Sequence, residues 1–165
     1  RKGVLVRRLQ AFESLAGIDT VVFDKTGTLT EARMGLQAVK TRDGISAEQA
    51  LQMARALARH SLHPVSRALV TGAADLTEVT DLTDLTEVGE FSGQGVEGTF
   101  VIGNTYGLRG KLRLGSARFC GLDGALHDGP PGSSQVFLVD GSGWMAVFHI
   151  DEVLRPNASE VVNAL

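Results

Sequence analysis

Cysteine, proline and aromatic residues are scarce in this chain of 165 residues, and it has no long apolar run. Its single cysteine, Cys120, excludes a disulfide within the chain and is typical of a reducing compartment. No stretch approaches the roughly 20 consecutive apolar residues that a membrane-spanning helix needs. The charged start of the chain also lacks the pattern of a signal peptide. We therefore expect a soluble segment.

An excess of basic residues is missing too. The chain carries 16 Lys and Arg against 19 Asp and Glu, which gives a formal net charge of −3. Because non-specific binding to nucleic acid needs cations that neutralise phosphates, this balance argues against nucleic acid as a partner. Hydrophobic residues nevertheless make up 43%, enough for a substantial core. The length suits one domain, or one domain with pieces of another.

The most informative segment is Asp-Lys-Thr-Gly-Thr-Leu-Thr at 24–30, which follows the apolar run at 20–23. That run predicts a buried parallel strand, which places Asp24 at a strand tip, where open α/β sheets bind ligands. Thr26 can donate a hydrogen bond to a phosphate oxygen, and Lys25 supplies positive charge. A carboxylate in this setting can act as a nucleophile towards a phosphoryl group.

The remaining pattern predicts helices followed by strands. Ser46 and Gln49 predict a capping box for a helix that stops near His60, and Pro64 suits the first turn of a second helix. Further helices are expected over 3–18 and from 157. Strands are expected over 36–39, 99–102, 106–114, 135–140 and 144–150, with a hairpin between the last two and a flexible loop over 122–134.

Two stretches are candidates for ligand binding. His63 stands before Pro64, so its direction is fixed and it could stack on, or hydrogen-bond to, an adenine ring. The stretch 93–98 fits Gly-x-Gly-x-x-Gly, but a predicted strand follows it, which argues against a dinucleotide fold. A tight turn between antiparallel strands is the better interpretation, and its glycines would let a ligand approach the backbone. A glycine hairpin without a ligand remains the alternative.

These motifs resemble those of a known family. The string at 24–30 resembles the phosphorylation motif of the P-type ATPases, ion pumps of the haloacid-dehalogenase superfamily. Ser61 to Pro64 is similar to the Ser-x-His-Pro signature of their heavy-metal (P1B) branch, and 151–156 resembles an Asp-x-x-Arg-Pro element. The resemblance implies that Asp24, beside Lys25, accepts the γ-phosphoryl group of ATP. It also implies Mg²⁺ held at Asp24 and Thr26, and a hinge at Asp151 and Arg155.

The resemblance also implies an ATP site in which His63 orients the nucleotide. The residues expected around the nucleotide are His63, Gly93, Gly95, Val96, Gly115 and Ser116. Gly103-Asn104 competes with Gly115-Ser116 for the family's Gly-Asn signature, and Gly115-Ser116 fits its spacing better. Two departures stand out, because Ala58 and Leu62 occupy positions where many members have Glu. We therefore expect altered or weaker contacts to the nucleotide.

The domain organisation follows from the same resemblance. Residues 31–150 are expected to form an α+β nucleotide-binding domain, an antiparallel sheet with two helices on one face. This domain would be inserted in an incomplete α/β haloacid-dehalogenase-like phosphorylation domain, represented by 1–30 and 151–165. The parent would be a membrane pump for a heavy metal, most often copper, with this segment on the cytoplasmic side. Its partners would be ATP and the missing membrane and phosphorylation domains.

Activity of the chain alone is a separate question. The family's Thr-Gly-Asp and Gly-Asp-Gly loops do not occur in it, so we expect binding without turnover. Two alternatives stay open. One is a soluble phosphatase of the same superfamily with an inserted cap, although Thr26 stands where those enzymes carry a second Asp. The other is a non-catalytic nucleotide-binding regulatory module.

Overall fold

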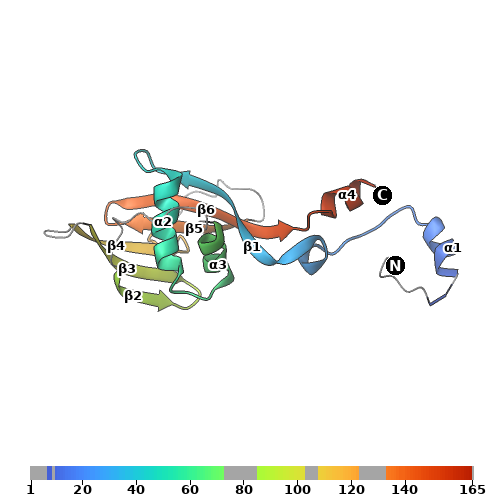
Figure 1. Ribbon diagram of the computed structural model, residues 1–165, viewed down its shortest axis with the longest axis horizontal. Coiled ribbons are helices and arrows are strands. Elements are labelled where there is room, and N and C mark those ends of the chain that lie inside the picture. The colour runs from blue at the N-terminus through green and yellow to red at the C-terminus, as the bar shows by residue number, and fades with distance from the viewer. Residues whose placement is uncertain (1–6, 9, 73–84, 103–107, 123–132, 165) are drawn as a thin grey trace.

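A computed structural model describes residues 7–8, 10–72, 85–102, 108–122 and 133–164. These residues form an antiparallel sheet in the order β1-β6-β5-β4-β3-β2, and helices α2 and α3 lie on one of its faces (Figure 1). The expected antiparallel sheet with two helices on one face is therefore confirmed. No helix in the described part of the chain is long and apolar enough to cross a membrane.

The elements have the following bounds. The strands are β1 (Thr30–Thr41), β2 (Thr86–Phe91), β3 (Gly95–Ile102), β4 (Leu108–Gly115), β5 (Ser134–Asp140) and β6 (Gly143–Leu154). The helices are α1 (Gln10–Ala16), α2 (Ala47–Ala58), α3 (Pro64–Gly72) and α4 (Ala158–Asn163), and η1 (Lys25–Leu29) is an irregular helical turn.

Helix α2 begins at the predicted capping box. The Ser46 hydroxyl accepts a hydrogen bond from the Gln49 backbone N–H at 3.1 Å, and the Gln49 side chain accepts one from the Ser46 N–H at 3.0 Å. Both contacts satisfy N–H groups that the first turn of a helix leaves unpaired. The apolar side of the helix, with Ala54 and Leu57 fully buried, then packs on the sheet.

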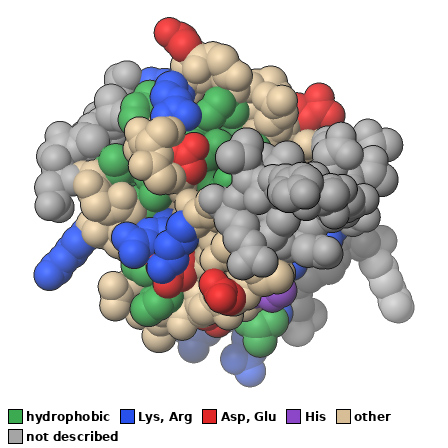
Figure 2. All heavy atoms as spheres, turned by 90° about the vertical axis from the view of Figure 1, so that its left-hand side faces the viewer, with side chains coloured by type: hydrophobic (Ala, Val, Ile, Leu, Met, Phe, Trp, Pro, Cys, Tyr) green, Lys and Arg blue, Asp and Glu red, His purple; other side chains and the backbone are tan. Residues whose placement is uncertain are grey.

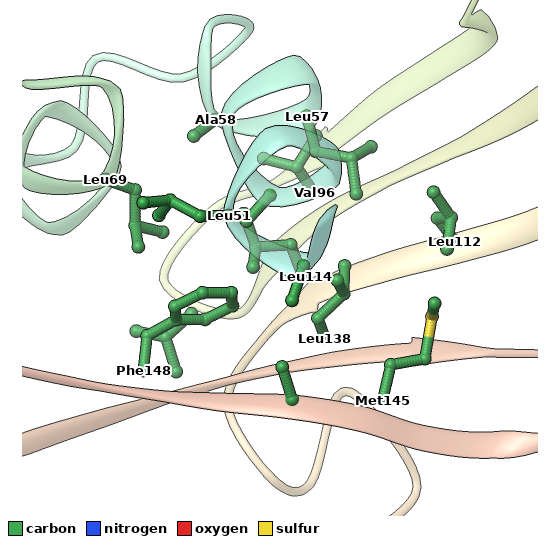
Figure 3. Close-up of a cluster of buried hydrophobic side chains, with 14 of the residues drawn as sticks. Leu51, Leu57, Ala58, Leu69, Val96, Leu112, Leu114, Leu138, Met145 and Phe148 are labelled. Carbon is green, nitrogen blue, oxygen red and sulfur yellow. The ribbon is translucent and has the colours of Figure 1, made fainter. Parts of the chain in front are cut away.

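The central strands carry apolar side chains on both faces of the sheet. Alternate residues of β5 and β6, such as Leu138 and Phe148, pack with the helices in the main core. Figure 3 shows Leu51 of α2 and Leu69 of α3 in the same cluster as Leu114, Leu138 and Phe148 of the sheet. The intervening residues Phe137, Val139 and Val147 form a second cluster on the other face, together with Cys120 from the segment after β4. Two buried faces explain why these strands read as nearly continuous apolar runs.

The strand expected at 20–23 is wrong. These residues have no regular structure, and Val22 is 89% exposed. A strand needs a neighbour to pair its backbone N–H and C=O groups, and the described residues place none beside 20–23. Asp24 therefore does not lie at the tip of a strand.

Other boundaries shift less. The strand expected at 36–39 is the middle of the longer β1, which pairs with β6 from Thr30 to Thr41. The hairpin is confirmed, with Asp140 opposite Gly143. Most of the loop expected at 122–134 lies outside the described residues, as does Gly103-Asn104.

Strand register brings six strand ends to one end of the sheet, which we call the site end. Thr30 opposes Leu154, Ser134 opposes Ile150, Gly115 opposes Phe137, and Gly95 opposes both Gly115 and Phe91. The site end therefore collects the start of β1, the end of β6, the start of β5, the end of β4, the start of β3 and the end of β2.

Charged side chains of both signs lie on the face opposite the site end. Seen from the end opposite the site end, Lys and Arg side chains lie among Asp and Glu side chains (Figure 2). On β3, the Glu97 carboxylate lies 2.8 Å from Lys111 Nζ and 3.0 Å from Arg113 Nε, both on β4. The hydrogen bond from Lys111 is the main reason why the pKa of Glu97 is lowered. This pairing fits the sequence, which has no basic excess.

Candidate functional site

A cavity of about 170 Å³ opens at the site end, between the start of α3 and the turn from β2 to β3. All six residues predicted to surround a nucleotide line this cavity: His63, Gly93, Gly95, Val96, Gly115 and Ser116. Apolar walls come from Val65, Leu69, Leu114 and Val136, and polar ones include Ser61 and Glu90. Such a mixture of apolar surface with a few polar groups is typical of small-molecule sites.

His63, directly before the N-terminus of α3, is held by local hydrogen bonds. Its ring Nδ1 accepts one from the Val65 backbone N–H at 3.3 Å, and its own backbone N–H donates to the Ser61 hydroxyl at 3.2 Å. In a neutral imidazole, an accepting Nδ1 leaves the proton on Nε2. The exposed ring therefore offers an N–H donor to whatever enters the cavity.

Ser61 links His63 to an acidic residue that the sequence analysis missed. Its buried hydroxyl donates to Glu90 Oε1 at 2.6 Å, while it accepts from the His63 N–H. Glu90 stands near the end of β2 and belongs to none of the motifs. Its position three residues before Gly93, on the strand that leads into the turn, is the only sequence signal that could have found it.

Two of the cavity glycines are required by the backbone itself. Gly95 and Gly115 face each other across β3 and β4, and a Cβ on Gly95 would lie 2.3 Å from the Leu114 carbonyl oxygen. Gly93 differs, because it has a φ of +69° and open space where its Cβ would point. The Gly93 turn, closed by a 2.9 Å hydrogen bond from the Gln94 N–H to the Phe91 carbonyl, thus leaves room for a ligand.

Ser116 lines the cavity but is partly engaged elsewhere. Its hydroxyl accepts from the Phe119 N–H at 3.2 Å, and its backbone N–H donates to the Gln94 carbonyl at 2.9 Å. The second contact ties the end of β4 to the Gly93 turn, and the first lies within the turn that follows β4. The competing pair Gly103-Asn104 lies outside the described residues, so the spacing argument for Gly115-Ser116 still decides between them.

The two departures from the family pattern lie in different environments. Ala58 of α2 is fully buried in the main core, whereas Leu62 is 82% exposed. In the described part of the chain neither residue lines the cavity. The carboxylate that does line it comes from Glu90 instead.

The loop around Asp24 is tied to the end of β6. Thr30, which is fully buried, donates to Glu152 Oε2 at 2.7 Å, and Thr26 donates to Glu152 Oε1 at 3.2 Å. Glu152 was not among the predicted residues, although it precedes Arg155 by the spacing of the Asp-x-x-Arg element. The Asp24 side chain itself is exposed and makes no capping hydrogen bond to η1.

The two predicted hinge residues also contact this loop. Lys25 Nζ lies 3.5 Å from Asp151 Oδ1, and Arg155 Nη2 donates to the Gly27 carbonyl at 3.1 Å. Gly27 has a φ of +78°, which favours glycine at this turn. The structure therefore brings Lys25, Asp151 and Arg155 together; their roles stay predictions.

Metal ligands are sparse here. Among the described residues, no group of three His, Cys, Asp or Glu could hold a metal ion. Asp24 and Thr26 offer one carboxylate and one hydroxyl, and Mg²⁺ usually combines one or two carboxylates with phosphate oxygens and water. Within the described ranges, the donors beside Asp24 would therefore need phosphate oxygens and water to complete a magnesium site.

The cavity and Asp24 lie at the same end of the sheet but towards different edges. The Asp24 loop leads into β1 at one edge, whereas the cavity is lined by β2 to β5. β1 and β3 are four positions apart, which is roughly 19 Å at the usual strand spacing. The structure does not bring these two groups of predicted residues into contact.

Comparison with known sequences gives relatives that span the whole chain. It is 39% identical over 168 aligned residues to the nitrogen fixation protein FixI of Rhizobium leguminosarum bv. viciae. It is 34% identical to the probable copper-transporting ATPase SynA of Synechococcus elongatus, and 32% identical to the copper-exporting P-type ATPase B of Archaeoglobus fulgidus. These alignments cover 99–100% of this chain but only 20–23% of the relatives, so the chain spans about a fifth of their length. No family model matches the chain.

Comparison with solved structures shows the same fold. The catalytic domain of the CPx-ATPase CopB-B matches 98% of this chain and 55% of its own, with a TM-score of 0.58 and 20% identity. A zinc-transporting PIB-type ATPase matches 85% of this chain and 22% of its own, with a TM-score of 0.61 and 24% identity. The N-domain of the copper-transporting P-type ATPase HMA6 matches 73% of this chain and 100% of its own, with a TM-score of 0.52 and 21% identity.

Proposed function

This chain is homologous to the heavy-metal P-type ATPases over its whole length, and we propose from that premise that its cavity binds ATP. One observation carries the proposal. His63, three glycines, Val96 and Ser116 come from separate segments of the chain, yet all of them line one cavity. Strand pairing accounts for the meeting of Gly95 with Gly115, but it does not account for His63, which reaches the same cavity from the start of α3.

The cavity's chemistry suits a purine ring with an attached polar chain. Leu69, Val96 and Leu114 offer apolar surface for the ring, and His63 Nε2–H offers a donor to a ring nitrogen. The open space at Gly93 would admit the sugar and phosphates close to backbone N–H groups. Ser61 and Glu90 complete the polar side of the pocket.

We propose further that residues 31–150 form a nucleotide-binding domain inserted between 1–30 and 151–165, two parts of a haloacid-dehalogenase-like phosphorylation domain. Thr30 and Leu154 are register partners, so the chain enters and leaves the sheet through neighbouring strands, as an inserted domain requires. Both flanks also expose apolar side chains: Phe12, Leu15, Ile18, Val21, Val22, Leu154, Val161 and Val162. Exposed apolar groups of this kind suit packing against further parts of a longer protein.

In that longer protein, Asp24 would accept the γ-phosphoryl group of ATP, with Lys25 and Thr26 beside it. The whole would couple ATP hydrolysis to transport of a heavy metal, copper being the ion named for two of the relatives, across a membrane. This segment would lie on the cytoplasmic side. Bound with the phosphates, Mg²⁺ would supply charge neutralisation, and Asp151 and Arg155 would form a hinge through their contacts with the Asp24 loop.

Calorimetric titration with ATP tests the nucleotide site. We expect roughly millimolar affinity, because Ala58 and Leu62 replace two acidic side chains. His63→Ala should weaken binding by about tenfold, the loss of one hydrogen bond with its stacking surface. Asp24→Asn is the matched control and should leave the affinity unchanged, because Asp24 lies away from the cavity. Equal losses in both variants would contradict this division of roles.

Amide NMR shifts in the same titration locate the ligand. ATP should shift the resonances of His63 and Gly95 and their neighbours. If saturating ATP moved neither, the cavity would not be the nucleotide site, even if binding were seen by calorimetry.

A further inference from the structure

We infer that Phe119 holds the Gly93 turn from behind the sheet and thereby positions it for the nucleotide. The cavity lies on the face that α3 covers, whereas Phe119 packs with the second apolar cluster on the opposite face, which we call the back face. In the part of the chain that the structure describes, Phe119 does not line the cavity. Because it would serve the proposed nucleotide site, this positioning role rests on the proposed function.

The alternation of side chains along β3 and β4 turns Gly95 and Gly115 towards the back face. Their neighbours Val96 and Leu114 lie in the main core beside α2 (Figure 3), so the two glycines face the other way. A Cβ on Gly95 would lie 2.7 Å from Phe119 Cδ1, and one on Gly115 would lie 2.9 Å from the same atom. The Phe119 ring therefore occupies the space that side chains at both positions would need.

The same ring contacts the residue with which the Gly93 turn begins. Phe91 is the register partner of Gly95, so it also lies on the back face, and its ring centroid is 5.3 Å from that of Phe119. The two rings are tilted by 46°, an arrangement that aromatic pairs favour. The Phe91 carbonyl accepts the hydrogen bond from Gln94 that closes the turn. Phe119 thus restrains the side chain of the residue whose backbone closes the turn.

A second connection runs through the backbone that follows β4. The Phe119 N–H donates to the Ser116 hydroxyl at 3.2 Å, and the Ser116 N–H donates to the Gln94 carbonyl at 2.9 Å. Arg113 restrains the ring as well, since its guanidinium carbon lies 5.7 Å from the ring centroid, within cation–π range, while its Nε donates to Glu97 at 3.0 Å. The ring and the backbone of Phe119 therefore both connect to the Gly93 turn.

A turn that is ordered before the ligand arrives binds it at a lower entropic cost. Residues 92–94 are exposed, and an exposed turn loses conformational freedom when a ligand fixes it. Contacts that already order the turn in the free protein remove this cost from the binding free energy. Phe119 makes such contacts from the back face, so its loss should weaken binding through the turn and not through a contact with the nucleotide.

Hydrogen exchange of two amides reports on the turn directly, because the Gln94 N–H donates to Phe91 and the Ser116 N–H donates to Gln94. Phe119→Leu removes the ring but keeps an apolar side chain. It should accelerate exchange of both amides, measured by NMR, and weaken ATP binding, measured by calorimetry, each by about fivefold. Phe119→Tyr keeps the ring and should keep both values of the unaltered chain. Val147→Ala thins the same apolar cluster from β6 and is the matched control, which should leave both unchanged.

Circular dichroism and thermal unfolding show whether each variant is folded. If Phe119→Leu does not fold, Phe91→Leu takes its place in the exchange measurement, because that position is 42% exposed and tolerates the change. Removing this other ring of the pair should accelerate exchange of the same two amides.

Three results would overturn the inference. Unchanged exchange in Phe119→Leu, or an equal acceleration in Val147→Ala, would show that the ring only fills the apolar cluster. Faster exchange with unchanged ATP affinity would show that the turn is held but not positioned for the nucleotide. In these cases ATP binding to the unaltered chain leaves the proposed nucleotide site standing. If instead ATP shifts no resonance of His63 or Gly95, the proposed site fails, and the positioning role fails with it.

Discussion

At the residue scale, the cavity depends on side chains that each do two things. The Ser61 hydroxyl fixes the His63 backbone through one lone pair and holds Glu90 through its proton. The His63 ring accepts from Val65 at one nitrogen and leaves the other as a donor. Because these groups are linked in series, a substitution at Ser61 acts on both walls of the cavity. Single-residue effects here are therefore not expected to add.

Cys120 provides a test of burial on the other face of the sheet. It is 7% exposed, and desolvation raises the pKa of its thiol to about 11. About one thiol in a thousand is then ionised at pH 8, against roughly a quarter for an exposed cysteine. We expect alkylation by iodoacetamide, followed by mass spectrometry, to be slow in the folded chain and to accelerate about tenfold per pH unit up to about pH 11.

Unfolding in guanidinium chloride is the control for that measurement, since it should make the thiol react at the ordinary rate. Fast, complete labelling of the folded chain at pH 8 would show that the second apolar cluster, in which Cys120 packs with Phe137, opens readily.

At the scale of elements, the approach of β3 to β4 sets a strict requirement for glycine. A Cβ on Gly95 would meet backbone at 2.3 Å, and one on Gly115 would meet the Gln94 carbonyl oxygen at the same distance. Gly95→Ala and Gly115→Ala should each lower the free energy of unfolding by about 2–3 kcal/mol through overpacking. Gly93→Ala should cost only about 1 kcal/mol, because its penalty is the positive φ alone.

Urea unfolding of the three variants makes this comparison. Equal midpoints for Gly93→Ala and Gly95→Ala would mean that the strands can separate to accept a side chain, and that the close approach is not a requirement of the fold.

Local signals predicted most of the elements. The capping box at Ser46, the helix start at Pro64 and the hairpin at 140–143 each depend on a few neighbouring residues, and all three are confirmed. The prediction of a strand at 20–23 is wrong because an apolar, β-branched run indicates only a preference for the extended conformation. Whether it becomes a strand depends on a partner, which is information that the run itself does not contain.

The cavity residues that belong to a sequence motif could be predicted, and those outside any motif could not. Glycines and a His-Pro pair mark the cavity because their backbone requirements are visible in the sequence. Glu90 and Glu152 are not visible in this way, since each acts through contacts with residues distant in the chain, Ser61 and Thr30. These pairings are created by the tertiary fold, through the β1–β6 register for Thr30 and Glu152 and through the position of the α2–α3 connection for Ser61 and Glu90, and no local pattern encodes them.

At the scale of the whole molecule, the arrangement separates the proposed nucleotide site from the proposed phosphoryl acceptor. The cavity and the Asp24 loop share the site end of the sheet but lie towards different edges. The proposed phosphoryl transfer therefore needs the loop and the cavity to approach each other. Contacts to the loop from Asp151 and Glu152, near the end of β6, and from Arg155 just after it place this part of the chain where such a movement could pivot.

This separation leads to the last prediction, that the 165-residue chain does not form a stable aspartyl-phosphate. Asp24 is exposed, and residues 20–23 lie outside the sheet, with Val22 89% exposed. Phosphoryl transfer depends on preorganised charges around the acceptor, and a misplacement of about 1 Å can already cost on the order of a hundredfold in rate. After incubation with γ-labelled ATP and Mg²⁺ and an acid quench, we expect no retained label. A longer chain that includes the family's Thr-Gly-Asp and Gly-Asp-Gly loops should retain label, and Asp24→Asn in that chain should abolish it. Label on the 165-residue chain that disappears in Asp24→Asn would show that the short chain already assembles a competent acceptor site.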